Sequence, residues 1–296
     1  AAPCRAVSPQ STAVDPARHG GWGPGEPRLM STGRFANLEM GKPEPGSPMA
    51  AQGAARRAAC PNDLRDADYY LNQGRALELA ADFEAALRSY SAVLGEDPTR
   101  LEGWLGQLWV LYELEEFPEV DLWARKASEQ FPENPALLAM RSLAAHGHGR
   151  RREGRGFNDA ALAGKGAVDV VWLARADLML DGTGPVGEEC LGHALRVSAT
   201  PDLTRLRGAR ICFRRKRYRL ALQELLEVTA HRPEAAGAWH LLGLVHDALG
   251  DGVRAAEALR QAVELAPRNA EFRADLDRLS RRGKGVAALF RRMLSR

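Results

Sequence analysis

The chain of 296 residues carries a net charge of +3, with 45% hydrophobic and 27% charged residues. This composition excludes a chain that is disordered throughout and one that is supercharged. The sequence has no apolar run of about 18 residues and no secretory pattern at its N-terminus, so we expect a cytoplasmic protein without a membrane partner. The length fits either two average domains or one repeat array.

The N-terminal segment differs in composition from the rest of the chain. Residues 1–61 hold nine of the 17 prolines and only two aromatic residues, Trp22 and Phe35, without a helical or alternating apolar period. Such a segment buries too little surface to offset its ordering entropy. We therefore expect residues 1–62 to be a disordered leader rich in proline and glycine, and Met30 is a candidate translation start.

Helical patterns begin near residue 66, and the prolines beyond it are periodic. Pro98 and Pro132 are 34 residues apart, and so are Pro233 and Pro267. The interval from Pro132 to Pro233 is 101 residues, one short of three times 34, which indicates one deleted residue in that stretch. A fixed period of this length predicts a repeat array.

Within the period, large, small and proline residues follow the pattern W-x2-L-G-x2-Y, then A-x3-F, then P. Residues 236–269 carry it most clearly, and residues 67–100 follow it nearly as well. The matching positions are Trp239, Leu242, Gly243, His246, Ala255, Leu259, Ala262 and Pro267 in the first of these segments, and Tyr70, Gly74, Leu77, Ala86, Tyr90 and Pro98 in the second. This chain resembles the tetratricopeptide repeat (TPR) family of bacterial type.

The resemblance implies an all-α fold, a right-handed α-solenoid of about six TPR-like helix-turn-helix repeats with a C-terminal capping helix. Each unit pairs two helices that bury their apolar faces only by stacking on neighbours. We expect an array over residues 63–269, with repeats at 67–100, 101–134, 135–168, 169–201, 202–235 and 236–269. Residues 270–296 would form the capping helix, over 270–282, and a basic helix, over 286–294. The second helix of the third repeat contains a glycine- and arginine-rich stretch and is expected to be short or frayed.

In this family the first helix of each pair lines a concave groove where partners bind, so the resemblance implies a non-enzymatic scaffold or adaptor for a protein or peptide segment. A step of one residue, about 100° around the helix, from the core positions of the first repeat points Leu71, Arg75 and Glu78 toward that groove. The same step selects the candidate groove residues Leu71, Arg75, Leu105, Trp109, Tyr112, Leu173, Asp177, Arg210, Phe213 and His240. Trp109 and Tyr112 are the best candidates to grip a peptide. Alternatively, the two rings pack against the neighbouring first helix.

Clusters of basic residues favour a second hypothesis, in which one edge of the array binds an anionic partner. The stretch from Arg205 to Arg219 contains many cations and no acid, and it covers the turn of the fifth repeat, while another arginine cluster covers the turn of the third. This edge of repeats 3 to 5 could bind an anionic partner or nucleic acid. The candidate residues are Arg151, Arg152, Arg214, Arg215, Lys216 and Arg217.

Other motifs carry no chemistry that we can assign. Residues 182–187 match G-x-G-x-x-G, but the segment contains Pro185 and follows a helix, so a turn explains it. His146 and His148 have no third ligand at metal-site spacing, and no nucleophile stands beside a histidine and an acid. We expect no catalytic residue, cofactor or metal site, and free thiols at the four scattered cysteines. Self-association through the groove or residues 286–294 stays open.

Overall fold

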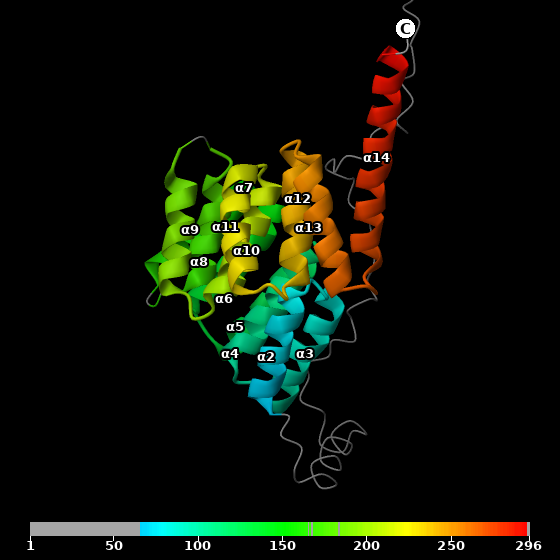
Figure 1. Cartoon of the computed structure of the whole chain (residues 1–296). Coiled ribbons are helices and arrows are strands. Elements are labelled where there is room, and N and C mark those ends of the chain that lie inside the picture. The colour runs from blue at the N-terminus through cyan, green and yellow to red at the C-terminus, as the bar shows by residue number, and fades with distance from the viewer. Residues whose placement is uncertain (1–65, 165, 167, 183, 295–296) are drawn as a thin grey trace, which may run out of the picture. The chain divides into compact units, whose positions relative to one another are not determined.

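Helices make up the fold throughout the part of the chain that the computed structural model describes. That part comprises residues 66–164, 166, 168–182 and 184–294, with side chains described up to residue 282. It contains thirteen helices and no strand (Figure 1). The predicted leader, residues 1–62, lies outside it. No described helix combines the length and apolar character that a membrane span requires.

Twelve of the helices form six consecutive pairs, and the thirteenth follows the last pair. The pairs are α2 (Ala67–Leu79) with α3 (Phe83–Glu96), α4 (Leu101–Glu113) with α5 (Phe117–Gln130), α6 (Pro135–Gly147) with α7 (Arg151–Ala163), α8 (Asp169–Met179) with α9 (Val186–Val197), α10 (Pro201–Arg214) with α11 (Tyr218–His231), and α12 (Ala236–Ala248) with α13 (Gly252–Leu265). The last helix is α14 (Ala270–Leu294). The expectation of an all-α helical repeat solenoid is confirmed.

The turn inside five of the six pairs has the same backbone conformation. In five pairs the first helix is followed by a residue with φ between 58° and 85°, the left-handed conformation that closes helices. These residues are Ala81, Glu115, Gly149, Lys216 and Gly250, and their spacings are 34, 34, 67 and 34 residues. The backbone N–H that follows each of them donates to the carbonyl five residues earlier, as Asp82 N does to Leu77 O. The interval one residue short of twice 34 spans the fourth pair, whose first helix has only 11 residues.

Small residues let neighbouring helices approach one another around aromatic side chains. A Cβ atom on Gly74 would lie 2.7 Å from the Tyr90 ring, and one on Gly106 would lie 2.4 Å from the same ring. Tyr90 is 1% exposed. The ring therefore fills the space that two glycines leave between the first and second pairs, which is why glycine and an aromatic residue recur at these positions.

The array also makes contacts between units that are distant in sequence. Helix α2 packs against both α10 and α12, so the first repeat contacts the fifth and the sixth. A Cβ atom on Gly237 would lie 2.7 Å from the carbonyl oxygen of Leu79 and 2.8 Å from the Cβ of Ala81. Ala81 also packs against the core cluster of Ala236, Ala262 and Phe272.

Gly237→Ala is expected to lower the free energy of unfolding by about 1–3 kcal/mol, because the added methyl group meets backbone atoms that cannot rotate away. Urea unfolding followed by circular dichroism measures the change. The matched control is Gly156→Ala in α7, where nothing lies within 4 Å of the added Cβ. That substitution should stabilise the protein by about 0.5–1 kcal/mol. Equal effects of the two substitutions would contradict the described contact between the first and sixth repeats.

Two expectations about local structure are wrong. Helix α7 spans 13 residues and is neither short nor frayed, because its glycine at position 154 packs against the Ser142 carbonyl oxygen, 3.0 Å from where a Cβ would stand. The capping helix and the basic stretch at 286–294 are one helix, α14, which continues through Gly283 and Gly285. The cysteines within the described residues, Cys190 and Cys212, are free, as predicted, and both are buried.

Candidate binding surface

The ten candidate groove residues all lie on first helices of the pairs, on the side that we call the inner face. Three of them, Arg75, Leu105 and Phe213, are half-buried. The other seven are at most 8% exposed, namely Leu71, Trp109, Tyr112, Leu173, Asp177, Arg210 and His240. The rings of Trp109 and Tyr112 pack together with centroids 5.6 Å apart. Side chains of the chain itself therefore cover most of the inner face.

Helix α10 supplies the covering side chains, with arginines at 207, 210 and 214 on one side of the helix. Arg207 forms a bidentate ion pair with Glu78 of α2, with nitrogen–oxygen distances of 2.7 and 2.8 Å. Glu78 is completely buried and also accepts a hydrogen bond from the Tyr90 hydroxyl. The Arg207 guanidinium lies over the Trp109 ring, 4.6 Å from its centroid. Burial alone would lower the pKa of Arg207, but the Glu78 carboxylate outweighs burial and raises it.

A second ion pair joins α10 to α4. Arg214 Nη1 donates to Glu113 Oε2 at 3.0 Å, and Trp109 Nε1 donates to the other oxygen of the same carboxylate. The Arg214 guanidinium lies 4.5 Å from the centroid of the Tyr112 ring. Trp109 and Tyr112 thus form part of a layer of rings and guanidinium groups between α4 and α10, a helix of the fifth repeat.

A third cluster lies where α6, α8 and the end of α10 meet. Asp177 is completely buried and accepts hydrogen bonds from Arg215 at both oxygens, each at 2.8 Å. Nδ1 of His146 lies 2.6 Å from the same carboxylate. Burial by itself raises the pKa of Asp177, but the hydrogen bonds with His146 and Arg215 outweigh burial and hold that pKa at about 2. Asp177 is therefore ionised at neutral pH and anchors the end of α10.

Arg210 differs from its neighbours on α10. Its Nη2 donates to the backbone oxygen of Glu78 and its guanidinium lies 5.0 Å from the centroid of the Phe83 ring, but it forms no ion pair with any described carboxylate. Its Nη1 is buried without a partner, as are Nε and Nη2 of Arg214. Burial lowers the pKa of Arg210. The inner face therefore holds buried cationic donors that the described residues leave unsatisfied.

The predicted basic edge is largely neutralised by contacts within the chain. Arg151 pairs with Asp181, Arg214 with Glu113 and Arg215 with Asp177. Arg217 donates to the backbone oxygens of Leu180 and Gly182. Arg152 and Lys216 are the edge residues that are exposed and form no ion pair within the described part of the chain. A pocket of about 290 Å³ lies at this edge, lined by His146, Arg151, Arg155, Leu178, Met179, Asp181 and Gly182.

Several residues of the inner face did not emerge as candidates from the sequence. Arg207 and Glu113 belong to it, although the candidate set contains neither. Their spacing from the candidate residues could have identified them. Arg207 stands three residues before Arg210 on the same helix, and Glu113 directly follows Tyr112. His240 is a groove candidate that the structure separates from the others, since it contacts Phe272 and Asp275 of the C-terminal helix.

Comparisons with known proteins agree with the repeat architecture. Residues 236–269 match the family model of the tetratricopeptide repeat. No curated protein sequence matches the chain.

Solved structures with similar folds share little sequence identity with this chain. The APC/C hetero-tetramer Cut9–Hcn1 is 12% identical with a TM-score of 0.46, covering 78% of this chain and 46% of the other. The human IFIT1 dimer with PPP-AAAA is 21% identical with a TM-score of 0.46, covering 68% and 50%. A tetratricopeptide repeat protein from Parabacteroides merdae is 16% identical with a TM-score of 0.45, covering 77% and 89%.

This chain spans about half the length of the first two of these proteins. What they bind or assemble with is therefore not transferred to it. The repeat architecture depends instead on the matched unit at residues 236–269 and on the six helix pairs, five of which share the same turn. Residues 236–269 thus match a tetratricopeptide repeat unit, and the described part of the chain is an all-α helical repeat solenoid.

Proposed function

We propose that this protein is a non-enzymatic TPR scaffold that binds an acidic segment of another protein at the inner face, beside α10. The observation that carries the proposal is Arg210, a buried guanidinium between two other arginines of the same helix that has no carboxylate partner among the described residues. A buried charge is costly unless it is paired. A carboxylate from a partner would pair with it, and hydrogen bonds to charged groups contribute about 1.5–3 kcal/mol each.

Half-buried residues give a ligand its first contacts with the inner face. The side chain of Arg214 is 28% exposed, and its buried Nε and Nη2 have no hydrogen-bond partner among the described residues. Phe213, next to it, is half-buried and packs against Tyr218 with ring centroids 5.7 Å apart. The proposed ligand therefore combines a carboxylate for the arginines with an apolar side chain for Phe213. Some inner-face side chains must move aside on binding, because the described inner face is packed.

Selection from a random peptide library displayed on phage, with the purified full chain as bait, tests this proposal. We expect the selected peptides to be enriched in aspartate and glutamate next to an apolar residue. A synthetic peptide from the selection should bind Arg210→Met at least tenfold more weakly, as measured by fluorescence anisotropy. The matched control is Arg254→Gln, which changes an arginine of α13 that is 70% exposed and should leave binding unchanged. Selected peptides without acidic enrichment, or equal binding by Arg210→Met, would refute the proposal.

Trp109 and Tyr112 are poor choices for this experiment. Both are buried, at 0% and 2% exposure, so truncating either leaves a cavity and confounds binding with unfolding. Phe213→Ala is a better second variant because Phe213 is half-buried. It should weaken peptide binding without unfolding the chain.

A labelled single-stranded oligonucleotide tests the nucleic-acid hypothesis in the same assay. Binding through phosphates falls by orders of magnitude between low and moderate salt, since counterions are released. The ion pairs of Arg151, Arg214 and Arg215 leave few free cations at the edge, so we expect little oligonucleotide binding. Salt-sensitive binding that competes with the selected peptide would favour the nucleic-acid hypothesis over the peptide proposal.

A further inference from the structure

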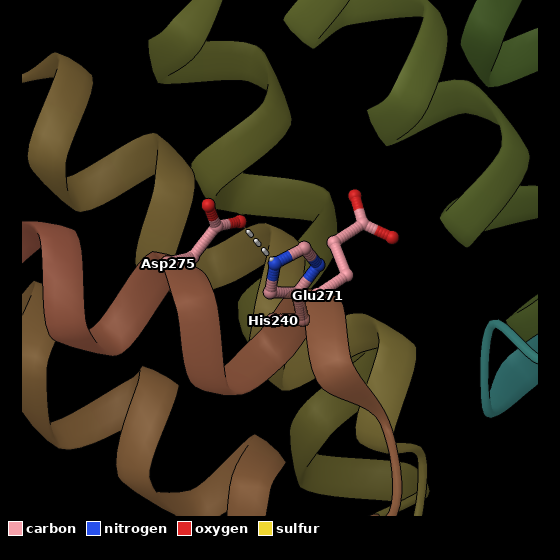
Figure 2. A group of neighbouring side chains, drawn as sticks. All are labelled: His240, Glu271 and Asp275. Carbon is pink, nitrogen blue, oxygen red and sulfur yellow. Dashed lines mark hydrogen bonds and ion pairs between the residues drawn. The ribbon is translucent and has the colours of Figure 1, made fainter.

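Three potential metal ligands meet where the last repeat contacts the C-terminal helix. His240 extends from α12, and Glu271 and Asp275 extend from the first turns of α14 (Figure 2). One ligand atom from each residue lies within 4.8 Å of the other two. Glu271 and Asp275 are four residues apart on a helix, which places both carboxylates on the same face, toward α12. Thirty-one residues separate His240 from Glu271, so spacing along the sequence does not reveal the group.

The histidine and the aspartate are held in place by neighbouring groups. The His240 side chain is 10% exposed, and its ring stacks on Phe272 with centroids 4.2 Å apart and planes 23° apart. Nε2 of His240 lies 2.8 Å from Asp275 Oδ2, while Arg278 Nη2 forms an ion pair with Asp275 Oδ1 at 2.9 Å. These contacts fix the orientation of the imidazole and of the Asp275 carboxylate, as a preorganised site requires.

The start of α14 fixes the backbone of the third potential ligand, Glu271, while its exposed side chain can change rotamer. Asn269 accepts hydrogen bonds from the backbone N–H groups of Glu271 and Phe272, at 3.0 and 3.3 Å. The Glu271 residue is exposed, and no ion pair or hydrogen bond of its carboxylate is described. A change of rotamer is therefore enough to bring that carboxylate closer to the imidazole.

We propose that His240, Glu271 and Asp275 bind one divalent transition-metal ion, with zinc as the best match. Zinc takes imidazole nitrogen at about 2.0–2.1 Å and carboxylate oxygen at about 2.0–2.2 Å, and sites with three protein ligands keep a fourth position for water. Tetrahedral geometry at these bond lengths sets the ligand atoms about 3.3 Å apart. The present separations are all within 4.8 Å, so a change of the Glu271 rotamer with small shifts of His240 and Asp275 would reach it. Magnesium and calcium prefer oxygen ligands alone and fit a buried imidazole less well.

Binding at this site would join the C-terminal helix to the last repeat. His240 belongs to α12 and both carboxylates belong to α14, so the ion would cross-link the two elements. An ion that binds the folded protein stabilises it by mass action. Zinc should therefore raise the unfolding temperature of the full chain.

Isothermal titration of the full chain with zinc chloride, followed by thermal unfolding with and without zinc, tests the proposal. We expect one site per chain that magnesium chloride at the same concentration does not fill. Glu271→Gln should weaken zinc binding at least tenfold and abolish the thermal shift. Its matched control is Asp277→Asn, which removes one exposed carboxylate from the same helix and should bind zinc like the wild type.

The Glu271→Gln variant separates a metal ligand from a structural residue. Glu271 is exposed and makes no described side-chain contact, so its substitution should not change the stability of the zinc-free protein. His240→Gln provides a second test and should remove the same site. Absence of zinc binding by the wild type, or unchanged affinity in both variants because zinc binds elsewhere, would overturn the proposal.

Discussion

Replacing Glu78 by glutamine is expected to lower the free energy of unfolding by about 3–5 kcal/mol, because it leaves a buried arginine without its counter-ion. Glu78 has no exposed surface, and its carboxylate accepts two hydrogen bonds from Arg207 and one from Tyr90. The glutamine amide keeps the size of the side chain but not its charge. Because Glu78 and Arg207 are 129 residues apart, the loss falls on the contact between the first and fifth repeats.

Urea unfolding of the wild type and the variant measures this effect. Glu129→Gln is the matched control, since Glu129 is exposed on the second helix of its pair and should change stability by less than about 0.5 kcal/mol. The double variant Glu78→Gln/Arg207→Met removes both charges and should recover part of the loss. A loss below about 1 kcal/mol in the single variant, or no recovery in the double variant, would show that the pair does not hold the two repeats together.

The sequence predicted the helix pairs well because each pair obeys local rules. The 34-residue period sets the glycines and aromatic residues that let two helices pack, and the left-handed turn residues follow the same period. Stepping 100° around the first helices also selected Glu78 and Trp109, and both of these side chains contact Arg207 in the structure. These features depend on residues that are close together in the sequence.

The local sequence pattern does not predict contacts between repeats that are far apart in the sequence. Nothing in the local pattern indicates that α10 returns to α2, so the basic run near Arg207 suggested an edge for an anionic partner or nucleic acid, whereas Arg207 is buried against Glu78. The glycine at position 154 suggested a frayed helix, because glycine destabilises helices on average. In the structure that glycine permits close packing of α7 on Ser142, whose hydroxyl donates to the Gly154 carbonyl oxygen at 2.7 Å.

Replacing Arg210 by methionine should stabilise the protein, in contrast to Glu78→Gln. We expect the free energy of unfolding to rise by about 1–4 kcal/mol. Arg210 is 8% exposed, has no ion pair with a described residue and leaves Nη1 without a partner, so the folded state bears much of its desolvation cost. Methionine keeps most of the methylene stem against Phe83 and removes the charge. The backbone oxygen of Glu78 that Arg210 contacts still accepts a hydrogen bond from Ala81 N.

Urea unfolding measures the expected increase in the free energy of unfolding. Comparing this increase with the change in peptide binding shows whether Arg210 serves a ligand. The matched control is Arg205→Met on the same helix, which should give no gain, because Arg205 pairs with Glu224 and the substitution removes that ion pair. A residue that destabilises the fold is expected where function requires it. If Arg210→Met is more stable and binds the selected acidic peptide more weakly, then the unpaired arginine is retained for its ligand. A loss of stability in Arg210→Met would mean that the guanidinium is satisfied within the chain, and the acidic-segment proposal would lose its main support.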